Sequence, residues 1–105
     1  MPLAARATYK PEALRDLEHL PRDVQLAFRK AREALLRDPT HPARNGVDAV
    51  RYEHGSWRLK VGEYRAIYYL LPGLVVDFYC FGERNALYSR FKLMFDLGFL
   101  PEKPD

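Results

Sequence analysis

The sequence has one cysteine, Cys80, among its 105 residues. A single cysteine excludes an intrachain disulfide framework and any zinc module built from several cysteines. Long hydrophobic runs are also missing, because none approaches the roughly 18 apolar residues of a membrane-spanning helix. Residues 1–9 lack the apolar core of a signal peptide. We therefore expect a cytoplasmic protein without membrane partners.

Metal ligands and activated nucleophiles are scarce as well. His19, His41 and His54 do not form a pair with metal-ligand spacing. The serines, Ser56 and Ser89, lack the context of a nucleophile elbow. No glycine pattern is typical of a phosphate-binding loop. The sequence thus predicts neither a metal site nor a cofactor.

What is present is the composition of an ordinary folded protein, with 48% hydrophobic and 30% charged residues. This balance excludes disorder, and the length predicts one domain over residues 1–105. The net charge of +3 is weak evidence for a nucleic-acid partner, so its distribution matters. Cations outnumber acids between residues 51 and 92, where Arg51 and Arg90 are candidate nucleic-acid contacts.

Hydrophobic spacing first predicts a strand and then two helices. Residues 3–9 alternate in polarity, which is typical of a strand. Pro11 suits the first position of a helix. The apolar residues that follow at helical spacing are Leu14, Leu17 and Leu20. Pro21 begins a second helix, which ends at Asp38-Pro39 because the residue before proline avoids helical geometry. Its apolar positions are Val24, Ala27, Phe28, Ala31 and Leu35.

After a loop at 39–46, the hydrophobic period changes to two. The predicted strands are 57–61, 64–71 and 74–81, separated by turns at Gly62-Glu63 and Pro72-Gly73. They form a three-stranded antiparallel meander. A helix over about 86–96 is expected to close the domain. The order β-α-α-β-β-β-α predicts an α+β fold, with a helical hairpin packed on a twisted, mainly antiparallel sheet and a C-terminal helix.

The first turn sets the register of the hairpin. A two-residue turn at Gly62-Glu63 places Lys60 directly opposite Arg65, on the same face as Arg58. Like charges directly opposite one another destabilise a sheet, and a bound anion such as phosphate converts the repulsion into attraction. The alternative interpretation is the solvated side of an edge strand.

The second turn extends this cluster. Carrying the register across Pro72-Gly73 sets Arg65 near Cys80 and brings Arg84 and Tyr88 toward the same end of the sheet. Several cations and one phenol in one place suit phosphoryl chemistry without a metal. A one-residue slip would send these side chains to the opposite face.

Two other groups of side chains have less specific interpretations. Cys80 is expected to be a small buried hydrophobic residue. The aromatic residues of the strands are expected mostly to build the core, while one of them could stack on a base. They are Tyr64, Tyr68, Tyr69, Phe78 and Tyr79.

Two stretches resemble the RelE/ParE toxin superfamily. Residues 57–68, WRLKVGEYRAIY, are similar to its core pattern W-R-x-R/K-x-G-x-Y-R-x-x-Y. Residues 81–88, FGERNALY, are similar to its closing pattern G-H-R-x-x-V-Y. The predicted element order also matches that of the superfamily along nearly the whole chain.

The resemblance implies the toxin of a type II toxin–antitoxin system, acting as a RelE-type, ribosome-dependent endoribonuclease on mRNA. In such enzymes the ribose 2′-hydroxyl attacks the adjacent phosphate without a metal. By position, Arg65 would stabilise the transition state, Arg84 would protonate the leaving group and Tyr88 would orient or stack the substrate. Arg58 and Lys60 fall on the basic pair, one of which would act as base. The implied partners are a cognate antitoxin, the ribosome and mRNA.

Alternatives remain within the same superfamily. Glu83 departs from the pattern and would either pair with Arg84 or act as a base itself. ParE-type members inhibit DNA gyrase without cutting RNA and share part of the arginine pattern, and a third possibility is a non-toxic orphan. Tyr88 favours the nuclease. The open face of the sheet and the apolar last helix predict docking of an antitoxin segment that covers the site, and the apolar residues of that helix are Leu87, Phe91, Leu93 and Phe95.

Overall fold

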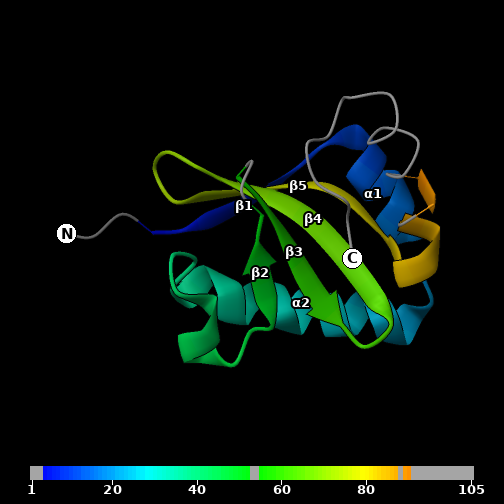
Figure 1. Ribbon diagram of the computed structural model, residues 1–105, viewed down its shortest axis with the longest axis horizontal. Coiled ribbons are helices and arrows are strands. Elements are labelled where there is room, and N and C mark those ends of the chain that lie inside the picture. The colour runs from blue at the N-terminus through cyan, green and yellow to red at the C-terminus, as the bar shows by residue number, and fades with distance from the viewer. Residues whose placement is uncertain (1–3, 53–54, 88, 91–105) are drawn as a thin grey trace.

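The computed structural model describes residues 4–52, 55–87 and 89–90 (Figure 1). Its elements are β1 (Arg6–Tyr9), α1 (Pro11–Glu18), α2 (Arg22–Arg37), the 3₁₀ helix η1 (Pro42–Asn45), β2 (Ala49–Arg51), β3 (Ser56–Val61), β4 (Tyr64–Leu71) and β5 (Val75–Glu83). The strands form one sheet in the order β1-β5-β4-β3-β2, with β1 parallel to β5 and the other pairs antiparallel. The predicted α+β class is confirmed.

The predicted helical hairpin is confirmed, and its prolines act as expected. Pro11 is the first residue of α1, Pro21 precedes the first turn of α2, and α2 ends before Asp38. The predicted face of α1 is wrong at Leu14, which is 47% exposed. Ala13 takes its place in the core, because the face of α1 that packs on the core carries Ala13 and Leu17, which are four residues apart, and Leu20 follows just after the helix.

The sheet is larger than the sequence predicts. The strand β2 lies in a segment without a predicted element and pairs with β3, and η1 occupies part of the predicted loop. A strand of three residues carries too few alternating positions to be recognised by its period. The helical residues after β5 begin at position 84 rather than 86, and the rest of the predicted last helix lies outside the described residues.

The two hairpins differ in how well their registers follow the sequence. The predicted pairing of Lys60 with Arg65 is confirmed. Gly62 has φ 58°, the left-handed value that a two-residue hairpin turn requires at its first central position. In the second hairpin, Arg65 lies opposite Gly82, so the predicted neighbour Cys80 is wrong.

Two local features move this second register. The connection between β4 and β5 has three residues, since Leu71 pairs with Val75, and Leu74 adopts φ 59°. A bulge follows, because Tyr68 pairs with Phe78 whereas Ile67 pairs with Cys80. Relative to a hairpin with a two-residue turn and no bulge, the longer connection adds one residue to the loop and the bulge adds one residue to β5. Together they shift the partner of Arg65 by two positions.

The core lies between the helical hairpin and one face of the sheet, and in Figure 1 α2 runs behind the strands. Its buried members from the helices and the sheet are Ala13, Phe28, Leu35, Val47, Leu59, Ala66, Tyr68, Val76, Phe78 and Phe81. Alternation along each strand then places Arg58, Lys60 and Arg65 on the second face. We call this second face the cationic face.

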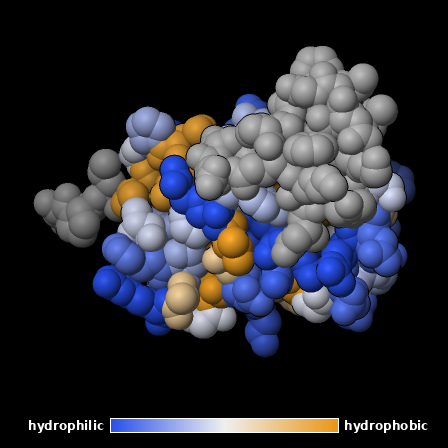
Figure 2. Space-filling view, in the orientation of Figure 1, coloured by the Kyte–Doolittle hydropathy of each residue, from blue (hydrophilic) through white to orange (hydrophobic). Residues whose placement is uncertain are grey.

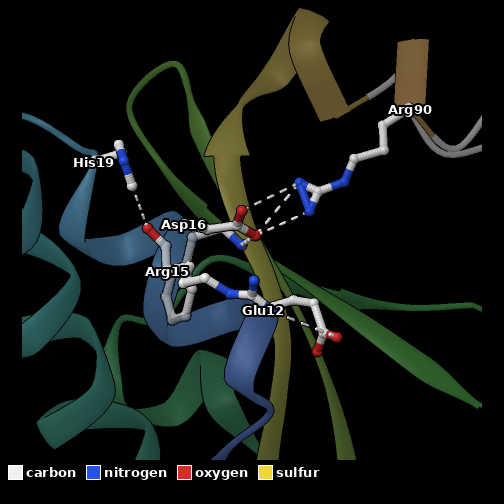
Figure 3. A network of polar contacts seen from close by, with 6 residues as sticks. Glu12, Arg15, Asp16, His19 and Arg90 are labelled. Carbon is white, nitrogen blue, oxygen red and sulfur yellow. Dashed lines mark hydrogen bonds and ion pairs between the residues drawn. The ribbon is translucent and has the colours of Figure 1, made fainter.

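The helix α1 is joined to β5 by one carboxylate (Figure 3). The parallel pairing of β1 with β5 ends at Tyr9 and Phe78, and beyond this point no strand of the described chain lies along the outer edge of β5. There the Phe81 N–H donates to Asp16 Oδ2 at 3.1 Å, and Arg90 Nη2 lies 2.9 Å from the same oxygen. Asp16 therefore satisfies a backbone donor that the sheet leaves unpaired.

The predicted burial of Cys80 is confirmed, since the residue is 3% exposed. Burial raises the pKa of its thiol to about 12. A cysteine with an ordinary pKa is roughly half ionised at pH 8.5, and only the thiolate reacts quickly. We expect iodoacetamide to alkylate Cys80 at pH 8.5 at least about 100-fold more slowly in the native protein than in urea. Mass spectrometry measures both rates, and equal rates would contradict the burial of this thiol.

Candidate functional site

The candidate site lies on the cationic face at the β3–β4 hairpin. Lys60 is directly opposite Arg65, and Arg58 lies two residues before Lys60 on β3. Arg58 and Arg65 are only 4% and 8% exposed, whereas Lys60 is half-buried. Two arginines are thus buried at diagonal positions of neighbouring strands. Figure 2 shows strongly hydrophilic surface on the side where this turn and the residues after β5 lie in Figure 1.

Arg65 is held against its own turn. Its Nη1 donates to the carbonyl oxygens of Gly62 at 2.7 Å and Tyr64 at 2.9 Å. Its Nε is buried and has no hydrogen-bond acceptor among the described residues. A buried donor without an acceptor costs about 1–3 kcal/mol, and in native proteins such a group calls for a specific explanation. An anionic oxygen is the acceptor that best suits a guanidinium nitrogen.

Arg58 contacts an aromatic ring and lies near other cations. Its guanidinium carbon is 5.9 Å from the centroid of the Tyr52 ring, a cation–π distance. Burial lowers the pKa of Arg58, and the charges of Arg65 and Arg84 lower it further. Tyr52 and Asp48 act in the opposite direction on this pKa. Burial and neighbouring positive charge both make an anion favourable beside Arg58.

Arg84 approaches the cluster through the backbone. Its N–H donates to the Glu63 carbonyl at 2.8 Å, which ties the end of β5 to the β3–β4 turn. Since Gly82 is the partner of Arg65, Arg84 follows that position by two residues instead of the predicted four. The corrected register therefore brings Arg84 closer to Arg65 than predicted. The side chain of Arg84 is exposed.

Gly82 and Glu83 are the last two residues of β5 and directly precede Arg84. A Cβ at Gly82 would lie 3.2 Å from the Leu87 side chain, so glycine permits the helical residues to pack closely on the strand. Glu83 is exposed and pairs with Tyr64, whose ring packs against the core. Glu83 forms no ion pair with Arg84 in the described part of the chain.

Other predicted site residues lie elsewhere. Arg51 is exposed and pairs with Trp57, which packs toward the core, so Arg51 is not on the cationic face. Arg90 pairs with Asp16 of α1 (Figure 3). Tyr88 lies outside the described residues. The structure thus brings together Arg58, Lys60, Arg65 and Arg84.

Sequence reasoning missed Tyr52 as a neighbour of Arg58. Tyr52 directly follows β2, so a prediction of β2 and of its pairing with β3 would have placed Tyr52 near Arg58. Within residues 4–52, 55–87 and 89–90, His, Cys, Asp and Glu side chains form no group of three or more suited to a metal ion. No helix in the described chain is long and apolar enough to span a membrane.

Residues 7–88 match the sequence model of a toxin family, described as the ParE toxin of the type II toxin–antitoxin system parDE. The match spans most of the chain, which therefore belongs to this family of type II toxins. The resemblance to the RelE/ParE superfamily is confirmed. No curated protein sequence matches the chain significantly.

Solved RelE structures have the same fold. A chain of the RelB–RelE complex from Methanococcus jannaschii matches with a TM-score of 0.67 and 17% identity, covering 80% of this chain and 98% of that one. The isolated E. coli RelE toxin matches with a TM-score of 0.64 and 21% identity, covering 88% and 99%. A chain of the RelE–RelB complex from Pyrococcus horikoshii OT3 matches with a TM-score of 0.62 and 20% identity, covering 77% of this chain and 96% of that one. At these identities the likeness establishes the fold.

The opposition of Lys60 and Arg65 predicts that this site lowers the stability of the protein. We expect Lys60→Gln to raise the free energy of unfolding by about 0.2–1 kcal/mol, since like charges directly opposite one another destabilise a sheet. Urea denaturation measures the change. The control is Lys30→Gln at an exposed position of α2. Equal or lower stability in Lys60→Gln would show that the opposed charges impose no cost.

Proposed function

We propose that this toxin is a ribosome-dependent endoribonuclease that cuts mRNA through the ribose 2′-hydroxyl. The observation that supports this most is the direct opposition of Lys60 and Arg65, with Arg58 buried beside them. Such a cluster reduces stability in the unbound protein, and a phosphate between the cations would reverse the sign of the interaction. RNA supplies that phosphate together with an internal nucleophile.

The reaction needs charge stabilisation more than any other contribution. Attack of the 2′-oxygen forms a bond to phosphorus and gives a phosphorane-like transition state with added negative charge. Arg65, fixed by two hydrogen bonds to its turn, offers a preorganised cation with its Nε directed to no protein acceptor in the described residues. Fixed donors in a site with little water are the arrangement that stabilises such charge most.

Proton transfer is assigned to the remaining residues. We assign the base to Lys60, which would accept the 2′-hydroxyl proton as the neutral amine, because an ammonium group gives up its proton far more readily than a guanidinium. Arg84, exposed next to the turn, would donate a proton to the leaving 5′-oxygen as the bond from that oxygen to phosphorus breaks. Tyr88 is proposed to stack on or orient the substrate. The products are a cyclic 2′,3′-phosphate and a 5′-hydroxyl.

The proposed partners follow from the family and the charge. RelE toxins from Methanococcus jannaschii and E. coli were crystallised with the antitoxin RelB. We propose that this toxin likewise binds a cognate antitoxin, whose acidic residues would meet the cationic face. Its substrate would be mRNA held on the ribosome, which places its action in the cytoplasm. Of the predicted antitoxin contacts, Leu87 is buried, and Phe91, Leu93 and Phe95 lie outside the described residues.

Arg84 gives the cleanest test of this assignment, because its side chain is exposed. We expect Arg84→Ala to cut mRNA at least about 100-fold more slowly with an unchanged melting temperature, since losing one transition-state charge contact costs about 2.7–4 kcal/mol. Primer extension on mRNA in translating ribosomes measures the rate. Arg44→Ala, at an exposed position of η1, is the matched control.

Arg65 needs a different variant, since its side chain also bonds to Gly62 and Tyr64. Arg65→Lys keeps a positive charge and removes the fork of donors, so it should lose most activity with a smaller loss of stability than Arg65→Ala. If both Arg84→Ala and Arg65→Lys cut mRNA at the wild-type rate, neither arginine takes part in the reaction. DNA breakage without mRNA cleavage would instead identify a ParE-type gyrase inhibitor.

A further inference from the structure

The cationic face carries an aromatic pair that the proposed chemistry does not use. The centroids of the Tyr69 and Tyr79 rings are 4.7 Å apart, on β4 and β5. Tyr69 lies four positions after Arg65 on β4, so both side chains lie on the same face. The bulge in β5 lies opposite Ile67 and Tyr68, and its additional residue is Tyr79. Bulges near functional sites commonly redirect a side chain in this way.

Tyr79 is exposed and has a positioned cation beside it. The residue is 39% exposed and belongs to the exposed large hydrophobic residues of the described structure. Lys10 Nζ lies 5.1 Å from its centroid and 3.2 Å from Asp77 Oδ2. Asp77 is itself buried and accepts a hydrogen bond from the Thr8 hydroxyl at 2.8 Å. The Asp77 carboxylate thus positions an ammonium group next to an exposed aromatic ring.

The aromatic pair adjoins the cationic cluster. Tyr69 pairs with Ser56 and Ile67 pairs with Arg58, so one residue pair separates the two features along β3 and β4. From Arg65 to Tyr69 the strand rises roughly 13 Å, which a single strand of RNA spans in a few nucleotides. Sites for single-stranded nucleic acid combine aromatic side chains for the bases with cations for the backbone.

We propose that Tyr69 and Tyr79 form a second base-binding subsite, which stacks a nucleotide outside the scissile pair while Lys10 contacts its phosphate. This inference rests on the proposed endoribonuclease function. The occupant is RNA rather than a protein segment, because the cations on either side, Lys10 and Arg58, match a regularly charged backbone. The subsite would add affinity and a nucleotide preference without taking part in the chemistry.

The test measures cleavage of mRNA on ribosomes as a function of ribosome concentration. The substrates are 5′-labelled mRNAs in which one base at a time near the cleavage position is removed, and the products are separated on gels. We expect Tyr79→Ala to raise KM at least about 5-fold, the lower end of the effect of losing one base–aromatic stack, with kcat changed much less. Tyr79→Phe keeps the ring and should behave as wild type. Leu14→Ala, at a 47% exposed position of α1, is the matched control.

The missing bases identify the contact. One abasic position should raise the KM of wild type by the same factor and leave the KM of Tyr79→Ala unchanged, because the two changes remove one interaction. A wild-type KM for Tyr79→Ala, or the same loss with every abasic mRNA, would overturn the subsite while cleavage itself continues. Absence of cleavage by the wild-type protein would refute the proposed function, and the subsite with it.

Discussion

The direct opposition of Lys60 and Arg65 is the constraint on which the site depends. It follows from a two-residue turn with a left-handed glycine, because that turn leaves only one register for the hairpin. The helical hairpin covers the other face of the sheet with an apolar core, so the alternation of the strands places the cations opposite that core. The same turn then accepts two hydrogen bonds from Arg65 and one from the backbone of Arg84.

Burial makes this cluster unusual. Buried arginines are costly unless they are compensated, and here the compensation comes from turn carbonyls for Arg65 and from the Tyr52 ring near Arg58. The turn carbonyls hold Arg65 without cancelling its positive charge. Arg90, in contrast, is paired with the Asp16 carboxylate at the edge of β5. Arg58, Lys60 and Arg65 thus gather near the β3–β4 turn, which is where we propose that a phosphate binds.

The sequence predicted those parts of the site that depend on short-range rules. Proline positions located both helices, and the Gly62-Glu63 turn located the pairing of Lys60 with Arg65. The predicted position of Arg65 relative to β5 was wrong. The left-handed Leu74 and the bulge at Tyr79 depend on tertiary packing and have no local sequence signal. Tyr52 was missed for a similar reason, since β2 exists only by pairing with β3. The family resemblance supplied the roles of the residues, which the pattern of charges alone does not contain.

The central claim is that the cationic face acts on the phosphate of mRNA during translation. The most direct measurement is to induce the toxin alone in cells and to map the 5′ ends of all mRNAs. We expect new 5′-hydroxyl ends inside translated regions, in phase with codons, and we expect these ends to be lost with Arg84→Ala. Intact mRNA accompanied by DNA breakage and filamentation would contradict the claim and place the target at DNA gyrase.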